Sequence, residues 1–288
     1  MVITDLAYFD IRRLIAEHAP ERGGALYGVR GYPLVSHFEL DSEGETSAVS
    51  YKPSSALVEN VQRVERDTGL QFKGIVHSHP AGLRRPSWGD EQAVASFFQL
   101  NPHLSSMSLP IVQRVEQSGR DADFIHWYRA DRAANSQRPV PWSFSGAPRS
   151  SGVSIAEEEL QILPLNSHVG VVLEKLKGFE LRFRLSGSGK ANYLRIENAQ
   201  FVGLSAEDCS GRELLYYVTI DYPHVAPLVL YRSDGQMRNL QFHWDGLNAL
   251  ESSLAGLSVA LAEQWGARLR VTNYLGSAPN QINSEGGT

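Results

Sequence analysis

The sequence predicts two domains of different class, an α/β domain over residues 1–130 and an α+β domain over residues 153–272. Three observations support this division. Strand-like and helix-like segments alternate in the first part, whereas the second part has alternating apolar segments followed by one long apolar helix. Between them, residues 131–152 are rich in Ser, Pro, Ala and Arg and are interpreted as a linker. The polar residues 273–288 are expected to form a disordered tail.

In the first domain, apolar residues at helical spacing predict helices, and short apolar runs between turn residues predict strands. A helix that begins after Ser54 or Ser55 is expected to end at Gly69, and a helix that follows Ser87 is expected to end at Asn101. The other expected elements are a helix at 5–18, strands at 24–29, 34–40 and 72–76, and a hairpin of 107–115 with 123–129 around a turn at 117–120.

In the second domain, the pattern predicts an antiparallel meander and then a long C-terminal helix of about five turns. Gly187-Ser188-Gly189 is a strong turn signal between the first two strands. The expected elements are strands at 179–185, 193–202, 213–220 and 227–231, and a helix at 247–265.

Two histidines and an aspartate form the most informative motif. His77 and His79 follow the strand at 72–76, and side chains two residues apart project to the same side of an extended segment. Asp90, after an intervening turn, can return as a third metal ligand. Two imidazoles and one carboxylate leave a tetrahedral position open, which is typical of catalytic zinc, whereas structural zinc sites more often use several cysteines. The chain has one cysteine, Cys209.

The same residues also permit simpler interpretations. Histidines spaced by two can be polar positions on a strand. Ser87 and Asp90 fit a capping box at the start of the following helix. Capping and metal binding need not compete, because the first turn of that helix presents Asp90 in both cases.

The run from His77 to Asp90 resembles the His-x-His-x7-Ser-x-x-Asp signature of the JAMM (MPN+) metalloproteases and fits it without a gap. The resemblance covers roughly residues 1–130 and implies a JAMM (cytidine-deaminase-like) α/β sandwich. It also implies a zinc-dependent peptidase or isopeptidase, often one that removes or trims ubiquitin-like modifiers.

That family also uses an upstream glutamate, usually before a Gly-rich apolar strand. Glu21, which precedes Gly23-Gly24, is the matching position, and Glu17 and Glu39 are the nearby alternatives.

The expected chemistry assigns a role to each residue. One zinc ion on His77, His79 and Asp90 would lower the pKa of a bound water from 15.7 to about 7 and polarise the carbonyl under attack. A carboxylate near the metal can take the proton of that water and pass it to the leaving amine, and Glu21 is the candidate. Ser87 offers a hydroxyl donor to the developing oxyanion.

The second domain carries a different motif. Tyr222-Pro223-His224-Val225-Ala226-Pro227 resembles the Tyr-Pro-x-x-x-Pro turn of ubiquitin-conjugating enzymes and RWD domains. A conjugating enzyme needs a cysteine after this turn, but Cys209 precedes it. The resemblance therefore implies a domain that binds rather than transfers. An unrelated α+β domain with a Pro-rich turn is the alternative.

Composition limits the remaining classes of function, partner and location. The chain has 288 residues, a net charge of −5, 42% hydrophobic and 20% charged residues, as in soluble globular proteins. Its basic residues are dispersed, so neither nucleic acid nor an anionic membrane is an expected partner. No segment reaches the length of a membrane span, and the N-terminal residues lack the features of a signal peptide. A cytoplasmic location is the expectation.

Three functional hypotheses follow. The first is a zinc isopeptidase that cleaves after the C-terminal glycine of a ubiquitin-like protein. Its partners would be the modifier, its conjugates or conjugation-system enzymes. This resembles the deconjugating proteins of bacterial ubiquitin-like systems, some of which act in antiphage defence. The second is a peptidase that processes sulfur-carrier or other flexible tails. The third is a non-catalytic MPN scaffold, and a RadC-like protein is a further alternative because its similar motif also matches Pro80, Gly82 and Pro86.

Overall fold

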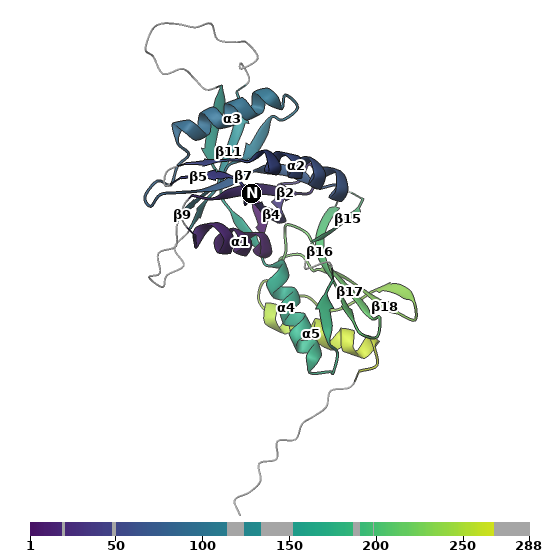
Figure 1. The fold of residues 1–288 in the computed structure, drawn as a ribbon. Coiled ribbons are helices and arrows are strands. Elements are labelled where there is room, and N and C mark those ends of the chain that lie inside the picture. The colour runs from purple at the N-terminus through teal and green to yellow at the C-terminus, as the bar shows by residue number, and fades with distance from the viewer. Residues whose placement is uncertain are drawn as a thin grey trace, which may run out of the picture.

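The computed structural model describes residues 1–18, 21–47, 50–113, 124–133, 152–186, 191–197 and 199–267. They form two regions that share a small sheet (Figure 1). The predicted turns at 117–120 and 187–189, most of the predicted linker and the predicted tail lie outside the described residues.

An eight-stranded mixed sheet forms the first region, and β7 (Gln71–His79) lies at its centre. β7 pairs antiparallel with β2 (Gly23–Gly28) along one edge and parallel with β8 and β9 along the other. The α/β class predicted for this region is confirmed. The other strands are β4 (His37–Leu40), β8 (Ser106–Ser108), β9 (Ile111–Gln113), β10 (Ile125–His126), β11 (Tyr128–Arg132) and β12 (Val153–Glu157).

Helices cover both faces of this sheet. α1 (Asp5–Ile11), continued by a π-helical turn η1 (Arg12–Ala16), packs on one face with Val76 and Val112. α2 (Ser55–Thr68) and α3 (Trp88–Leu100) pack on the other face. Figure 1 shows α1 and α3 on opposite sides of the sheet. The predicted caps of α2 are confirmed, because the Ser54 hydroxyl accepts from the Leu57 N–H and Gly69 ends the helix in the left-handed conformation.

A β-bulge in β7 determines which face the two histidines occupy. Leu26 pairs with Gly74 but Tyr27 pairs with Phe72, so Lys73 is an extra residue on β7. Gly74 has φ +152°, and a Cβ there would lie 1.9 Å from the Ser108 carbonyl oxygen. Phe72 and Ile75 therefore both belong to the core on the α3 side. Bulges re-aim side chains in this way beside functional sites.

Two expected boundaries differ in the structure. The segment 34–40 forms two strands, because β3 (Leu34–Val35) leaves the main sheet and pairs with β1 (Val2–Thr4). β12, which follows the predicted linker, pairs antiparallel with β11 and completes the first sheet. A short hairpin of β5 (Glu45–Thr46) and β6 (Tyr51–Lys52) precedes α2.

The second region contains an antiparallel sheet in the order β14-β16-β17-β18-β19, with β15 also paired to β16. The predicted antiparallel meander is confirmed. The expected pairing of its first two strands is not observed, because β14 and β15 each pair with a different part of β16. The strands are β14 (Phe183–Leu185), β15 (Asn192–Ile196), β16 (Ala199–Asp208), β17 (Glu213–Val218), β18 (Leu228–Ser233) and β19 (Gln236–Asn239).

Two helices pack against this second sheet and against each other. α4 (Leu165–Lys177), which the sequence analysis did not predict, and α5 (Leu250–Gln264) bury Val172 and Leu257 in one core with Leu204 and Tyr216 of the strands. Within the described residues, no helix combines the length and the apolar character needed to cross a membrane.

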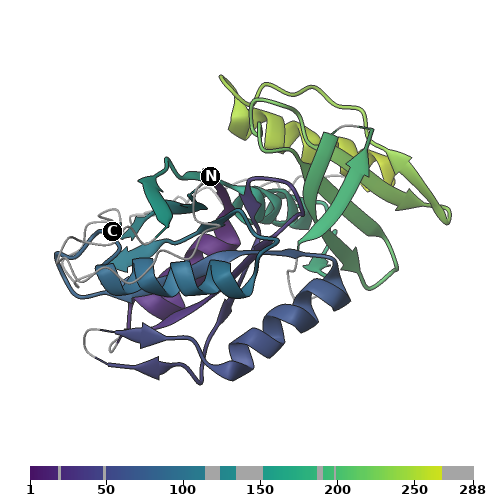
Figure 2. The same cartoon turned by 90° about the horizontal axis from the view of Figure 1, so that it is seen from above.

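The two regions are joined by hydrogen bonds as well as by packing. β1 lies between β3 and β13 (Gln161–Leu163), parallel to both. The Asp5 carboxylate accepts from the N–H groups of Asn166 at 2.9 Å and Ser167 at 2.8 Å. Asp5 thus caps α4, a helix without a side-chain cap of its own. Figure 2 shows the second region beside the C-terminal end of α2.

Candidate metal centre

The two histidines lie in the buried C-terminal part of β7, the central strand of the sheet. His77 and His79 are 5% and 7% exposed, and they project on the α3 side of β7. Ser78, between them, faces the other side. Its hydroxyl accepts from the Arg22 N–H at 2.9 Å, and its own N–H donates to the Arg22 carbonyl at 2.8 Å. The sequence analysis gave Ser78 no catalytic role, and the structure places it as a link between β7 and the segment that follows Glu21.

The first turn of α3 brings the carboxylate to the histidines. Ser87 is the N-cap residue, and its hydroxyl accepts from the Asp90 N–H at 3.3 Å. In return, Asp90 Oδ2 accepts from the Ser87 N–H at 2.6 Å, which completes a capping box. The capping interpretation of Ser87 and Asp90 is therefore confirmed. It coexists with the metal-ligand arrangement, because the same carboxylate also reaches both imidazoles.

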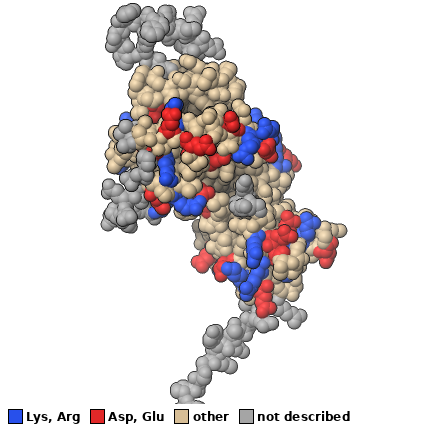
Figure 3. All heavy atoms as spheres, viewed as in Figure 1, with Lys and Arg blue, Asp and Glu red and all other residues tan. Residues whose placement is uncertain are grey.

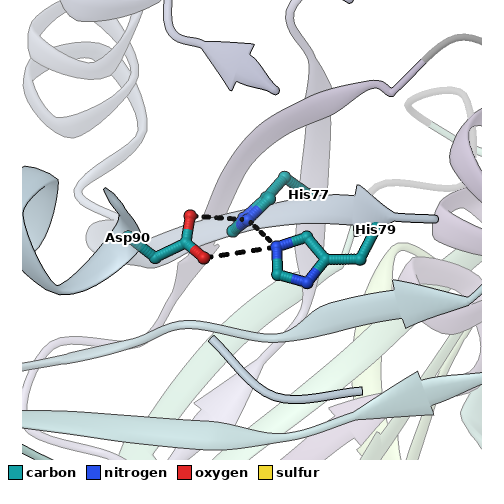
Figure 4. A group of neighbouring side chains, drawn as sticks. All are labelled: His77, His79 and Asp90. Carbon is teal, nitrogen blue, oxygen red and sulfur yellow. Dashed lines mark hydrogen bonds and ion pairs between the residues drawn. The ribbon is translucent and has the colours of Figure 1, made fainter. Parts of the chain in front are cut away.

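His77, His79 and Asp90 converge on one point (Figure 4). The two Nε2 atoms are 2.9 Å apart, and they lie 3.0 Å and 3.2 Å from Asp90 Oδ1 and Oδ2, respectively. The ligand atoms all lie within 4.8 Å of one another, close enough to share one ion. Two imidazole nitrogens and a carboxylate oxygen suit zinc and leave a coordination position open. The residues present therefore fit the metal.

A second set of hydrogen bonds fixes His79. Its Nδ1 lies 3.2 Å from the Leu83 carbonyl oxygen, which also accepts from Gln113 Nε2 at 2.8 Å. An Nδ1–H that donates to this carbonyl leaves Nε2 as the atom available to a metal ion where the three side chains converge. Such outer contacts set the tautomer and ring orientation of metal-binding histidines.

The charged groups of the site stabilise one another's ionised forms. Burial opposes ionisation of Asp90, but hydrogen bonds from His77 and His79 hold the pKa of its carboxyl well below the usual range. Burial lowers the pKa of His79, but Asp90 and Glu21 outweigh it, so the net pKa is raised. The Asp90 carboxylate therefore stays ionised, which is the form that metal binding requires.

Glu21 lies next to this cluster, at the entry to β2. The residue is 6% exposed, and its Oε1 atom has no hydrogen-bond partner within the described part of the chain. Burial raises the pKa of Glu21, and the nearby His79 and Asp90 have smaller, opposing effects. The two alternative glutamates are engaged elsewhere. Glu39 accepts from the Tyr27 hydroxyl at 3.2 Å, and Glu17 lies 3.8 Å from Arg12 with an exposed side chain.

Tyr51, from the β5–β6 hairpin, packs against the site although the sequence analysis did not identify it. Its ring stacks on His77 with centroids 6.2 Å apart and an interplanar angle of 23°. A Cβ on Gly23 would lie 2.2 Å from this ring, so only glycine allows β2 to approach it. The Tyr51 hydroxyl donates to Asp41 Oδ2 at 2.9 Å.

Asp41 connects this aromatic ring to α2. Its two carboxylate oxygens also accept from the N–H and the hydroxyl of Ser54 at 2.8 Å and 2.7 Å. Ser54 is the N-cap of α2. Asp41 is 8% exposed, and its hydrogen bonds join its own segment to the β5–β6 hairpin and to the start of α2.

An apolar cavity of about 400 Å³ opens beside the metal ligands. His77 and Asp90 form part of its wall. The rest of its lining is largely apolar and includes Tyr51, Pro53, Ile75, Phe97, Leu100 and Met107.

Comparison with known proteins is consistent with this geometry. Residues 11–120 match the family model described as prokaryotic homologs of the JAB domain. This match includes Glu21, His77, His79 and Asp90, and it supports a JAB/MPN-type fold for this part of the chain. That family includes zinc isopeptidases and non-catalytic members. No curated protein matched the chain.

Two solved structures show a weaker likeness. One is the solution structure of a protein from Desulfitobacterium hafniense, with 19% identity, a TM-score of 0.38, and coverage of 57% of this chain and 92% of that one. The other is the crystal structure of a JAB1/MPN domain protein from Archaeoglobus fulgidus, with 16% identity, a TM-score of 0.29, and coverage of 56% and 97%.

In the second region, the residues singled out by sequence do not form a catalytic cluster with the metal site. Tyr222 is fully buried, and its hydroxyl shares hydrogen bonds with Tyr216 at 3.0 Å and with His168. Cys209 is a free, exposed thiol. The RWD-like character of this region stays a prediction.

Proposed function

We propose that the chain is a zinc-dependent peptidase or isopeptidase that cleaves after the C-terminal glycine of a ubiquitin-like modifier. The observation that carries this proposal is the convergence of His77, His79 and Asp90 beside Glu21, a buried carboxylate with an unpaired oxygen. Unpaired buried carboxylates destabilise a fold, so their presence beside metal ligands favours a catalytic role.

Each side chain has a task in the proposed reaction. A zinc ion held by His77, His79 and Asp90 would supply Lewis acidity and acidify the attacking water. Glu21 takes a proton from that water and passes it to the leaving amine. Burial raises the pKa of Glu21 toward the working pH, which favours a group that both takes and returns a proton. The Ser87 hydroxyl donates to the oxygen on which negative charge develops.

The surroundings of the site favour an extended tail as the substrate. The two histidines are less than a tenth exposed, which leaves little room and favours glycine at the bond to be cleaved. The adjacent apolar cavity can take one apolar side chain of the same tail. Leu100, in the wall of this cavity, is an exposed apolar side chain, and Leu83 and Trp88 in the segment between His79 and Asp90 are also exposed. The surface over α3 carries little charge in Figure 3, whereas charges of both signs mix elsewhere on that face.

We assign the second region a binding role. An RWD-like domain there would hold the modifier, its conjugate or a conjugation enzyme, and its exposed Cys209 has no role in transfer. A cytoplasmic bacterial ubiquitin-like system, such as one in antiphage defence, is the proposed setting.

Cleavage of defined fusions tests the proposal. The full chain is incubated with fusions whose ubiquitin-like part ends in glycine, with and without a chelator. We expect cleavage that the chelator abolishes and added zinc restores. His77→Ala should lose both zinc and cleavage, because one of three protein ligands is removed.

Other results would separate the alternatives. Cleavage of short flexible tails but not of folded conjugates would favour a processing peptidase. Stoichiometric zinc without cleavage of any fusion would favour a scaffold. A chain that binds no zinc after resupply would exclude the proposed chemistry.

A further inference from the structure

A second cavity, distinct from the metal centre, lies on the α1 side of the sheet. Its volume is about 260 Å³, and its wall includes Tyr8 of α1, His126, Trp127, Glu157 and Glu158. Trp127 packs in the core cluster that contains α1, whereas His77 faces α3 across the sheet. We refer to this space as the Trp127 cavity.

Three residues in the wall of the Trp127 cavity each have a buried polar atom without a hydrogen-bond partner among the residues that the structure describes. These atoms are Trp127 Nε1, His126 Nε2 and Glu158 Oε2, and Trp127 as a whole is 1% exposed. The cations nearest to Glu158 are Arg129, 3.7 Å from Oε1, and the Met1 amino group, 4.0 Å from Oε2. Both lie beyond hydrogen-bonding distance. A buried polar group without a partner costs free energy, so three in one cavity indicate a molecule that pairs with them.

The polar atoms restrict the chemistry of that molecule. The Trp127 indole N–H can only donate, so the ligand must carry an acceptor. The Glu158 carboxylate accepts hydrogen bonds, so the ligand must also carry a donor. An anion is disfavoured, because Glu157 and Glu158 line the cavity and no Lys or Arg does. An ammonium or guanidinium would satisfy Glu158 but leave the indole N–H unpaired.

The remaining wall is apolar or aromatic, with Tyr8, Ile125, Leu160 and Ile162. Such a wall suits a flat group that packs between side chains while its edge forms hydrogen bonds. The geometry points to a binding site for a small, neutral, planar amide, either a carboxamide or a ring lactam. Its carbonyl oxygen accepts from Trp127 and its N–H donates to Glu158, while His126 donates or accepts as its tautomer permits.

Ligand-observed NMR on the full chain tests this assignment. Nicotinamide is the carboxamide probe and uracil is the lactam probe, each titrated into the millimolar range. We expect at least one to bind. Trp127→Phe keeps an aromatic ring but removes the indole N–H donor, and Glu158→Gln replaces a charged acceptor with a weaker neutral one. Each should weaken binding about tenfold. Trp88→Phe makes the same chemical change at a Trp that is 56% exposed, and should leave binding unchanged.

Two results would overturn the site. If neither probe binds, or if a bound probe is held equally by wild type, Trp127→Phe and Glu158→Gln, the cavity holds only water. Circular dichroism of each variant checks its fold. Should Trp127→Phe fail to fold, the Glu158→Gln result decides alone, because Glu158 is a quarter exposed and lies at the edge of the core. The result of this binding test does not depend on whether the protein binds zinc.

Discussion

The two regions differ in which of their buried polar atoms lack a hydrogen-bond partner. In the described part of the first region, Glu21 Oε1 and His126 Nε2 are buried without partners, although other buried carboxylates there are hydrogen-bonded. In the second, Asp208 pairs with Arg212 and the buried tyrosines pair with one another. The two unpaired buried atoms of the second region, Gln200 Oε1 and Thr219 Oγ1, belong to uncharged side chains. The comparison indicates that the first region leaves ionisable atoms unpaired, at a cost in stability that the second region avoids.

Glu21→Gln, in the first region, is the substitution with the largest expected effect. Turnover should fall by about 10²- to 10⁴-fold, because a general base is removed, while zinc content is unchanged. The native fold should become more stable at neutral pH. Burial raises the pKa of Glu21 in the native state. At a pH above the pKa of this group in the unfolded state, its charged form therefore destabilises the native state.

Glu17→Gln is the matched control for this change, because Glu17 is exposed and lies 3.8 Å from Arg12. It should alter neither turnover nor stability. Turnover by the zinc-loaded Glu21→Gln protein at the wild-type rate would remove Glu21 from the mechanism.

Tyr51→Leu tests whether the Tyr51 ring, by stacking on His77, strengthens zinc binding. Loss of the stacked ring should weaken zinc binding by about 10- to 100-fold, as for other groups that orient metal ligands. Tyr51→Phe keeps the ring and loses only the hydrogen bond to Asp41, so its effect should be smaller. Competition with a chromophoric chelator measures both affinities. Equal zinc affinity of Tyr51→Leu and wild type would show that β7 alone orients His77.

Leu257→Ala should affect the second region and leave the metal site intact. Leu257 is fully buried between α5 and the sheet, and its truncation should cost about 2–5 kcal/mol of unfolding free energy. Zinc affinity should not change, which a titration of the folded variant would check. A lower zinc affinity would mean that the packing change in the second region alters the first region through the contacts of β1, β13 and Asp5.

The local parts of the candidate site were predictable from sequence, and the long-range parts were not. His77, His79 and Asp90 follow from strand periodicity and helix capping, which act over a few residues. The bulge at Lys73 was not foreseen, since it depends on how β7 meets β2. Tyr51 was not foreseen either, because its contact with His77 joins residues that are distant in sequence.

The same distinction holds for the fold. Leu165, Val169, Val172 and Leu176 have the spacing of a buried helical face, so α4 was detectable in principle. Its start was hidden because Asp5, some 160 positions away, supplies the cap. The pairing of β12 with β11 likewise joins segments on either side of the predicted linker. No local pattern encodes such a contact.

Asp208→Asn is expected to have the smallest effect, a loss of unfolding free energy that depends on pH. Burial opposes ionisation of Asp208, but hydrogen bonds from Arg212 and Ser210 outweigh it and hold the pKa of its carboxyl below the usual value. The native state therefore binds this proton less tightly than the unfolded state does. The stabilisation is fully present above the unfolded pKa of about 3.9 and is lost as the pH falls through the folded pKa.

The variant should cost about 1–2 kcal/mol at neutral pH, because the amide still accepts hydrogen bonds but loses the charge facing Arg212. Urea unfolding at several pH values should show that the difference in unfolding free energy between wild type and Asp208→Asn becomes smaller below about pH 4. A difference that persists in acid would mean that Asp208 stabilises β16 through its shape and hydrogen bonds rather than its charge. The second region would then lack the charge pairing that separates it from the first.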